Sequence, residues 1–276
     1  MIRVAVFGAA GRMGAITCAT VASEDDTVLV GAVDPVAAGR HVGEVVGAAG
    51  AVVVGQPALV EVAAGPDELA AAGVDVAVDF TVAGAARENL RWCSAHGVHA
   101  VCGTTGFSEE DRREVAKWFS ASEANCIMAP NFSIGAVLMM RCAEICAPFL
   151  DGVEIIELHH DRKRDAPSGT SLETARRIES ARAAAGSDPL RRDPTERFAL
   201  EGTRGGVTAG GVQVHSVRLP GLVAHQQVIF GSVGETLTIR HDSTDRASFM
   251  PGVMLAVREV GNRPGLTVGL EPLLGM

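Results

Sequence analysis

The sequence predicts an α/β protein with two parts, a doubly wound parallel sheet and an α+β region whose sheet is mixed or antiparallel. Residues 2–7 form an apolar run with Arg3 as its one charged residue, as expected of a parallel strand that is buried on both faces. Further apolar runs alternate with helix-like runs through the first half of the chain, which is the pattern of a doubly wound sheet. In the second half, strand-like runs over 211–218, 222–230 and 235–240 are joined by short glycine-bearing turns, as in antiparallel sheets.

The composition indicates a globular protein and argues against several classes of function. The chain has 276 residues, 47% of them hydrophobic and 21% charged, with a net charge of −9. It contains no long basic run, which argues against a nucleic-acid surface. Its apolar runs are too short to cross a membrane, and residues 1–7 enter a strand directly, without the layout of a signal peptide. We therefore expect a cytoplasmic protein with no nucleic-acid or membrane partner.

The six cysteines predict reduced thiols. They are scattered among apolar residues without any C-x-x-C pair, a spacing unlike that of a disulfide framework. Cys142 and Cys146 share one helical face, and we expect both to lie in the core.

A glycine-rich turn after the first strand predicts a dinucleotide-binding site. A helix is expected from near Ala15, and a second strand over 27–33 ends in Asp34. Glycine lets the backbone approach a pyrophosphate, and a helix N-terminus directs N–H groups at that anion. An acid about 20 residues further on can accept hydrogen bonds from ribose hydroxyls. The pattern is Rossmann-like, with Ala10 where the common fingerprint has its middle glycine. The cofactor-binding residues predicted here are Gly8, Ala9, Ala10, Gly11, Arg12, Met13 and Asp34.

Three later strands of the first half end in polar or turn residues. Strands are expected over 74–81, 98–102 and 126–129, with helices over 83–96 and 109–121 between them. Ligands of doubly wound sheets bind beyond the carboxyl ends of the strands, so we expect the nicotinamide end of the cofactor there. The residues concerned are Thr81, Gly103, Thr104, Thr105, Ala129, Pro130, Asn131 and Phe132. Residues 51–55 are expected to form a further short strand, without an assigned function.

The segment from Glu157 to Thr170 combines proton donors with an anion-binding turn. It reads Glu-Leu-His-His-Asp-Arg-Lys-Arg-Asp-Ala-Pro-Ser-Gly-Thr, between a strand-like run over 153–156 and a helix expected over 171–185. Histidine titrates near neutrality and suits proton transfer, and a lysine adds positive charge where negative charge develops. A hydroxyl at the start of a helix, together with the N–H groups of the first turn, can hold a carboxylate. Consecutive residues of a strand point to opposite faces, so His159 and His160 are expected to do different jobs unless the strand ends between them.

The remaining charges of this segment have simpler interpretations. Asp165 is expected to orient the loop, and Arg162 and Arg164 to be solvated. Further along, Arg204-Gly205-Gly206 is a candidate hinge or substrate lid.

The second half is expected to form a separate domain between two parts of the first. A helix over 135–150 would link the domains, and residues 186–197 would form an exposed loop. Val223, Val228 and Phe230 are too many for a solvated face, so one sheet face is expected to pack on another subunit. A helix over 245–260 and a strand over 266–270 would return to the first domain. The expected division is 1–130 with 241–276 as the dinucleotide-binding domain, and 131–240 as the substrate-binding and oligomerisation domain.

With these motifs in place, the chain resembles the 4-hydroxy-tetrahydrodipicolinate reductase family over nearly its whole length. The family segment E-[LI]-H-H-x-x-K-x-D-A-P-S-G-T matches at Glu157–Thr170 and is highly specific. Further matches are the glycine turn at 8–14, D-F-T at 79–81, G-T-T-G at 103–106, A-P-N-F-S at 129–133, and the strand segments 214–218 and 221–226.

The resemblance implies an activity and roles for individual residues. It implies NAD(P)H-dependent reduction of a cyclic, doubly carboxylated imine with loss of water, in lysine and diaminopimelate biosynthesis. It also implies a homotetramer assembled through the sheet of the second domain. His159 would be the proton donor and acceptor, and Lys163 a second proton donor. The substrate carboxylates would be held by His160, Ser168, Gly169 and Thr170.

The cofactor preference rests on the end of the second strand. Asp34 replaces the Glu of some members, and Pro35 follows where NADPH-preferring relatives carry a basic residue. This favours NADH, whereas Arg12 and Arg40 leave NADPH open.

Three other functions are weighed against this one. A metal enzyme would use His159, His160 and Asp165 as ligands, but opposed strand faces disfavour a shared ion, and no metal site is expected. A non-catalytic NAD(H) sensor would need the glycine turn but neither His159 nor Lys163. Another two-domain reductase, such as aspartate-semialdehyde dehydrogenase, would need an activated cysteine, and no cysteine here has a recognisable activating context.

Overall fold

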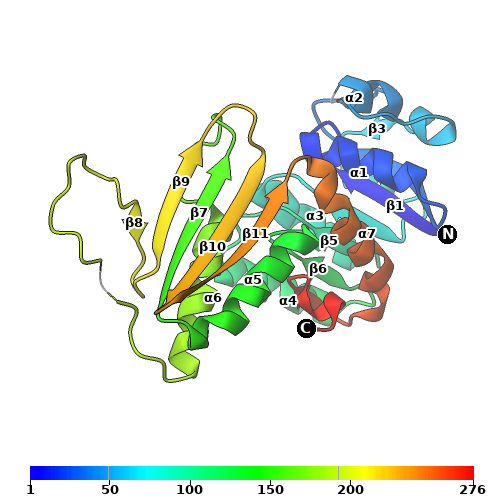
Figure 1. The fold of residues 1–276 in the computed structure, drawn as a ribbon. Helices are drawn as coiled ribbons and strands as arrows, with labels where there is room; N and C mark the ends of the chain where they lie inside the picture. The colour runs from blue at the N-terminus through cyan, green and yellow to red at the C-terminus, as the bar shows by residue number, and fades with distance from the viewer. Residues whose placement is uncertain (49, 192) are drawn as a thin grey trace. The chain divides into compact units, whose positions relative to one another are not determined.

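The protein divides into two compact units. The computed structural model describes residues 1–48, 50–191 and 193–276 (Figure 1). One unit comprises Met1–Ile134 and Phe249–Met276, and the other comprises Gly135–Ser248. The expected break after residue 240 would cut β11 (Glu235–Ser243), which pairs along its whole length with β10 (Ala224–Ser232). Since these two strands are hydrogen-bonded neighbours, β11 stays with the second unit.

The first unit is built on a seven-stranded parallel sheet. The strand order is β12-β6-β5-β4-β1-β2-β3, and every recorded pairing is parallel. The chain therefore runs outward from β1 in one direction and from β4 in the other. The place where the direction changes, between β1 and β4, is where ligands of such sheets bind. The strands are β1 (Ile2–Phe7), β2 (Thr27–Val33), β3 (Val62–Ala63), β4 (Val76–Asp79), β5 (His99–Cys102), β6 (Cys126–Met128) and β12 (Leu266–Val268).

Helices cover both faces of this sheet. α1 lies against α2 and α7, whereas α3 lies against α4 (Figure 1). Right-handed crossovers on the two sides of the direction change place the two sets of helices on opposite faces, which confirms the predicted doubly wound architecture. The α-helices are α1 (Arg12–Ser23), α2 (Val42–Ala48), α3 (Ala83–Ala95), α4 (Glu109–Ser120) and α7 (Met250–Glu259). Short 3₁₀ helices are Gln56–Leu59, Pro66–Leu69, Arg246–Phe249, Val260–Asn262 and Glu271–Leu274.

Two local predictions for the first unit are wrong. Residues 51–55 are not a strand, and the side chains of Val52 and Val54 are 78% and 76% exposed. The place beside β2 is taken instead by Val62–Ala63. The first helix begins at Arg12 rather than near Ala15, because Gly11 has the extended conformation of a capping residue.

The second unit is built on a five-stranded mixed sheet of order β11-β10-β7-β9-β8. β7 (Gly152–His159) pairs in parallel with β9 (Gln213–Arg218) and antiparallel with β10. β8 (Gly206–Val207) pairs antiparallel with β9. A purely antiparallel sheet is therefore excluded for this unit, and the mixed alternative holds. The long connection between β7 and β9, which includes α6 (Gly169–Ala184), allows the parallel pair.

One face of the mixed sheet packs within its own unit. Val228 and Phe230 are 0% and 1% exposed and join a core with residues of α5 (Ile134–Cys146), the 3₁₀ turn Ala147–Phe149 and α6. The expectation that these two residues face another subunit is wrong, since strand alternation turns them toward the helices. Val223 precedes β10 and is half-buried.

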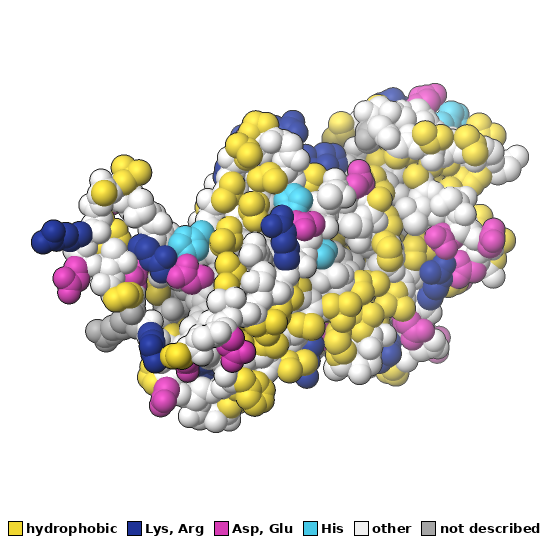
Figure 2. Space-filling view, viewed as in Figure 1, with side chains coloured by type: hydrophobic (Ala, Val, Ile, Leu, Met, Phe, Trp, Pro, Cys, Tyr) yellow, Lys and Arg dark blue, Asp and Glu magenta, His cyan; other side chains and the backbone are white. Residues whose placement is uncertain are grey.

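The opposite face of the mixed sheet carries alternating apolar and charged side chains. Ile156, Leu158 and Ile229 are half-buried there, beside Glu154 on the same strand. Figure 2 shows hydrophobic side chains interspersed with charged and histidine side chains on the side in view.

The cysteines are free thiols in two settings. Cys18, Cys93, Cys102 and Cys126 are buried. Cys142 is exposed and Cys146 half-buried, so the core prediction fails for Cys142. The buried positions of α5 include Met139, Met140 and Ala143. Among the described residues, no helix is long and apolar enough to span a membrane.

Candidate active site

The glycine-rich loop packs too closely for side chains at two of its glycines. Gly8 has φ +80°, and a Cβ there would lie 2.9 Å from the carbonyl oxygen of Phe80. A Cβ on Gly14 would lie 2.0 Å from the carbonyl oxygen of Gly8, so the helix can lie close to the strand only with glycine at this position. The loop thus connects β1 to the end of β4, where the sheet changes direction.

Asp34 is fastened to the same loop. Its Oδ2 accepts a hydrogen bond from the N–H of Ala10 at 3.0 Å, and its Oδ1 accepts one from the N–H of Val36 at 3.0 Å. Each carboxylate oxygen can accept further hydrogen bonds. The acid predicted to bind a ribose is therefore positioned beside the glycine-rich loop, next to the exposed Arg12 and half-buried Met13 at the start of α1.

Asp79 organises the polar strand ends and was missed from the sequence. It is 2% exposed and accepts hydrogen bonds from the N–H and Oγ1 of Thr81, from Oγ1 of Thr104 at 2.9 Å, and from Nδ2 of Asn89 at 2.7 Å. Two predicted cofactor residues, Thr81 and Thr104, are thus held by one buried carboxylate. An acid at the end of the otherwise apolar strand Val76–Asp79 was the available signal.

The ends of β4, β5 and β6 converge through an aromatic pair. The rings of Phe80 and Phe132 lie edge to face with centroids 6.0 Å apart, and a Cβ on Gly103 would lie 2.1 Å from the Phe80 ring. A cavity of about 120 Å³ lies at the ends of β5 and β6. Its lining includes Thr104, Thr105, Ala129 and Pro130. The structure therefore brings together strand-end residues that the sequence predicted as neighbours. Oδ1 of Asn131 accepts a hydrogen bond from the N–H of Ser133 at 2.8 Å.

The second unit places His159 at the end of β7, bonded to a buried carboxylate. Glu157 is 0% exposed, and its carboxylate bonds to Nδ1 of His159 and to both terminal nitrogens of Arg218, at 2.9 and 2.7 Å. It also accepts the N–H of Ser168 at 3.2 Å. Burial raises the pKa of Glu157, but hydrogen bonds from His159, Arg218 and Ser216 outweigh burial and lower the pKa to about 2. Glu157 is therefore ionised at neutral pH.

Lys163 lies in the loop that follows, paired with Asp165. Its Nζ is 2.8 Å from each carboxylate oxygen of Asp165, and this hydrogen bond lowers the pKa of Asp165. Nη2 of Arg218 donates to the carbonyl oxygen of Asp165 at 2.7 Å, which ties the loop to the sheet. The strand ends at His159, so the half-buried His160 begins the loop.

The turn before α6 is capped by Ser168. Its Oγ accepts the N–H of Ser171 at 3.2 Å, and the Oγ of Ser171 donates to Gln226 at 2.6 Å. Gly169 and Thr170 begin the helix, two residues earlier than predicted, because Ser168 has the extended conformation of a cap. Capping by Ser168 and an anion at the first turn are compatible, since the N–H groups there have no carbonyl of the same helix to donate to.

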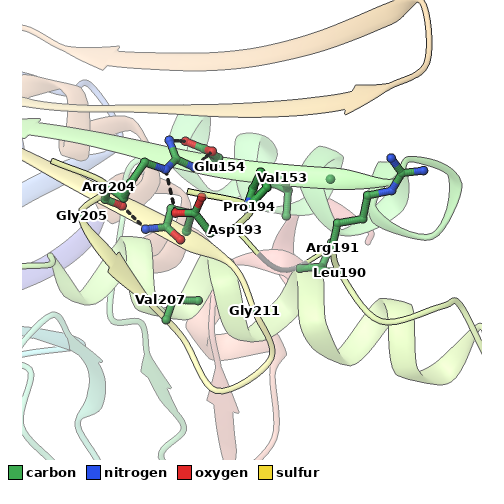
Figure 3. Close-up of a pocket in the computed structure, with 12 residues that line it drawn as sticks. Val153, Glu154, Leu190, Arg191, Asp193, Pro194, Arg204, Gly205, Val207 and Gly211 are labelled. Atoms are coloured by element: carbon green, nitrogen blue, oxygen red, sulfur yellow. Dashed lines mark hydrogen bonds and ion pairs between the residues drawn. The ribbon is translucent and has the colours of Figure 1, made fainter. Parts of the chain in front are cut away.

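Arg204 belongs to a different cluster, on the opposite face of the sheet. It forms ion pairs with Glu154 and with Asp193, the latter at 2.9 Å (Figure 3). Nε2 of His215 lies 2.7 Å from Glu154. Glu154, Asp193 and Arg204 border a cavity of about 570 Å³. The side chain of the predicted hinge is thus fastened to β7, and a Cβ on Gly205 would lie 2.3 Å from the carbonyl oxygen of Val214.

The metal alternative finds no support in the geometry. Among the described residues, no group of three His, Cys, Asp or Glu side chains is placed to hold a metal ion. His159 and Asp165, two of the ligands that this alternative needs, are engaged with Glu157 and Lys163.

The fold and the two sets of site residues define a class, the two-domain oxidoreductases with a Rossmann-like unit and a separate α+β unit. Two family models match, dihydrodipicolinate reductase N-terminus over residues 2–132 and C-terminus over residues 135–274. The chain is 50% identical to a 4-hydroxy-tetrahydrodipicolinate reductase of Cutibacterium acnes and 48% identical to one of Nocardia farcinica. The alignments cover 100% of this chain and 100% and 99% of the two relatives. The chain belongs to the dihydrodipicolinate reductase family and is an oxidoreductase.

Solved structures agree with this assignment. A dipicolinate-bound dihydrodipicolinate reductase from Paenisporosarcina sp. TG-14 superposes with a TM-score of 0.82 at 38% identity, covering 99% of both chains. An amine dehydrogenase from Mycobacterium smegmatis shares the fold at 18% identity, with a TM-score of 0.62 over 96% of this chain and 94% of the other.

Proposed function

We propose that the protein reduces 4-hydroxy-tetrahydrodipicolinate to tetrahydrodipicolinate with loss of water, as the names of its relatives indicate, in diaminopimelate and lysine biosynthesis. The observation that carries this proposal is the arrangement at residues 157–170. There, a histidine on a buried carboxylate, a lysine and a capped helix start occur within one short segment. The dipicolinate bound to one relative, a flat ring with two carboxylates, has the charge that such a site would take.

The cofactor is a nicotinamide dinucleotide at the carboxyl ends of the parallel strands. The glycine-rich loop and the start of α1 bind the pyrophosphate, and Asp34 accepts hydrogen bonds from the adenosine ribose. The residues around the Phe80–Phe132 pair hold the nicotinamide end. NADH is preferred, because Asp34 repels a 2′-phosphate, while Arg12 and Arg40 allow some use of NADPH.

The chemistry divides between the cofactor and the second unit. When bound, the nicotinamide would supply the hydride that reduces the ring formed by loss of water, and the reduction would also require a proton. His159 and Lys163 supply and accept protons at this stage. His160 and the turn at Ser168, Gly169 and Thr170 hold the two substrate carboxylates, the turn by its first N–H groups.

Assembly and location follow from the same assignment. The open face of the mixed sheet, with half-buried Ile156, Leu158 and Ile229, is the surface through which four copies associate. Association would bury these side chains, which favours it through the hydrophobic effect. The protein acts in the cytoplasm.

A spectrophotometric assay tests the activity. The aldol product of pyruvate and aspartate semialdehyde is supplied, and the loss of nicotinamide absorbance is followed separately with NADH and with NADPH. Turnover with a higher kcat/KM for NADH is expected, together with inhibition by dipicolinate. Binding of NADH without turnover would instead indicate a sensor, and the proposal would fail.

Asp34→Ala tests the cofactor assignment. Removing the carboxylate is expected to raise KM for NADH, while kcat changes little. The difference in kcat/KM between NADH and NADPH is therefore expected to become smaller. Equal preference for the two cofactors in the wild-type protein would contradict the assigned role of Asp34.

A further inference from the structure

A fully buried carboxylate connects the proposed proton donors to one another. Glu157 is 0% exposed and stands two residues before His159 on β7. An ionised carboxylate is costly to bury unless its oxygens accept several hydrogen bonds. The two carboxylate oxygens of Glu157 accept several hydrogen bonds. The donors lie on β9, on β7 itself and at the start of α6.

The bond to His159 selects one form of its ring. A carboxylate without a proton can only accept hydrogen bonds, so the nitrogen that faces it, Nδ1, carries a hydrogen. This leaves Nε2 as the nitrogen that exchanges a proton with the substrate.

The bonds to Arg218 extend the effect to Lys163. Two terminal nitrogens of Arg218 hold Glu157, and one of them also donates to the carbonyl oxygen of Asp165. The carboxylate of Asp165 in turn holds the ammonium of Lys163. A chain of four side chains thus sets the loop that carries the lysine relative to the ring of the histidine.

Besides Glu157, the charged groups near His159 come from β9 and from the loop after β7, where Asp161, Arg162 and Arg164 are exposed. The residue paired with it on β10 is Ala224, and the one paired with it on β9 is Arg218. The loop after β7 contributes Lys163 and Asp165, which pair with each other. The charge that Nδ1 contacts is that of Glu157.

We infer that Glu157 is a positioning residue of the reductase, which holds the Nδ1–H form of His159 and, through Arg218, the loop that carries Lys163. The inference deepens the proposed function and rests on it. Glu157 does not touch the substrate in this assignment; it acts through the two residues that do.

A matched pair of variants tests the inference. Glu157→Gln removes the charge and keeps the shape. Glu154→Gln removes the same charge from the same strand, where the carboxylate also bonds to an arginine and a histidine, but on the other face. Turnover is expected to fall on the order of 10- to 100-fold for Glu157→Gln and to stay within about twofold for Glu154→Gln. The Kd for NADH is expected to change in neither.

The split between kcat and KM separates positioning from a loss of structure. In Glu157→Gln, kcat is expected to fall by more than the KM for substrate changes, because the ring of His159 loses its orientation while the substrate can still bind. A folded Glu157→Gln variant with wild-type turnover, or with an unchanged kcat and only a raised KM, would overturn the inference.

The tautomer of His159 can be measured in the wild-type protein, so this test requires no variant. ¹⁵N NMR of the neutral ring is expected to show the hydrogen on Nδ1, and the opposite tautomer would refute the inference even if Glu157→Gln failed to fold. An inactive wild-type protein with the Nδ1–H tautomer would refute the proposed function and leave the positioning of His159 intact.

Discussion

Two acidic clusters on opposite faces of β7 share their chemistry and differ in burial. Glu157 binds an arginine and a histidine on the face toward the helices, and Glu154 binds an arginine and a histidine on the open face. The carboxylate side chain of Glu157 is 0% exposed, whereas that of Glu154 is 39% exposed. Partial burial raises the pKa of Glu154, and bonds from Arg204 and His215 outweigh it and lower the pKa. The same residue types therefore form a buried cluster on one face of β7 and a partly solvated cluster on the other, and the solvation decides how strongly each pair interacts.

The largest expected difference is in turnover, between a substitution in the loop beside Glu157 and one in the Glu154 cluster. Lys163→Ala should reduce turnover by on the order of 10²- to 10³-fold, because it removes the proposed second proton donor and its positive charge. NADH binding, measured by fluorescence titration, should be retained. Arg204→Ala, which empties the open-face cluster of its cation, is the control and should leave turnover within about twofold. Equal losses in the two variants would remove the functional distinction between the clusters.

Stability should show the next largest difference. Glu157→Gln should lower the free energy of unfolding at pH 7 by about 3 kcal/mol, since Arg218 and His159 keep their places but lose a buried charged partner. Glu154→Gln, which removes a partly solvated carboxylate, should cost less than about 1 kcal/mol. Urea denaturation of both variants measures this, and similar midpoints would show that burial does not distinguish the two acids.

The pH dependence of unfolding sharpens the comparison for the buried acid. The folded pKa of Glu157 is about 2, below the ordinary value of 4.5. The ionised Glu157 therefore contributes about 3 kcal/mol to the free energy of unfolding above pH 4.5. This contribution is lost as the pH falls from 4.5 toward 2. Denaturation of the wild-type protein and of Glu157→Gln across this range should give curves that converge at the acidic end. Parallel curves would contradict the assigned pKa.

Salt should produce the smallest effect. At about 1 M salt the Debye length falls to about 3 Å, so exposed pairs are screened while buried ones are not. The stability difference between the wild-type protein and Glu154→Gln should shrink toward zero at high salt, whereas that for Glu157→Gln should persist. A salt-independent difference for Glu154→Gln would place its cluster in a less solvated setting than the structure gives it.

The sequence predicted elements better than the bonds between them. Periodicity and turn residues predicted the alternation of strands and helices. The residues of Glu157–Thr170 predicted a loop between a strand and a helix. The bond from Arg218 to Glu157 needs the parallel register of β7 and β9, which no local pattern contains. Likewise, Asn89 reaches Asp79 only because α3 packs against β4. Residues 51–55 were mistaken for a strand because their valines are typical of strands, whereas strand pairing was satisfied elsewhere.

The return of the chain to its first unit has a consequence for biosynthesis on the ribosome. β12 adds the outer strand beside β6, and α7 covers the same sheet next to α1, yet both follow residue 248. The unit that begins first is therefore finished last, and the inserted unit has its complete sequence earlier. A nascent chain that has not yet reached residue 268 exposes the edge of β6, a surface that chaperones or other unfinished chains can engage.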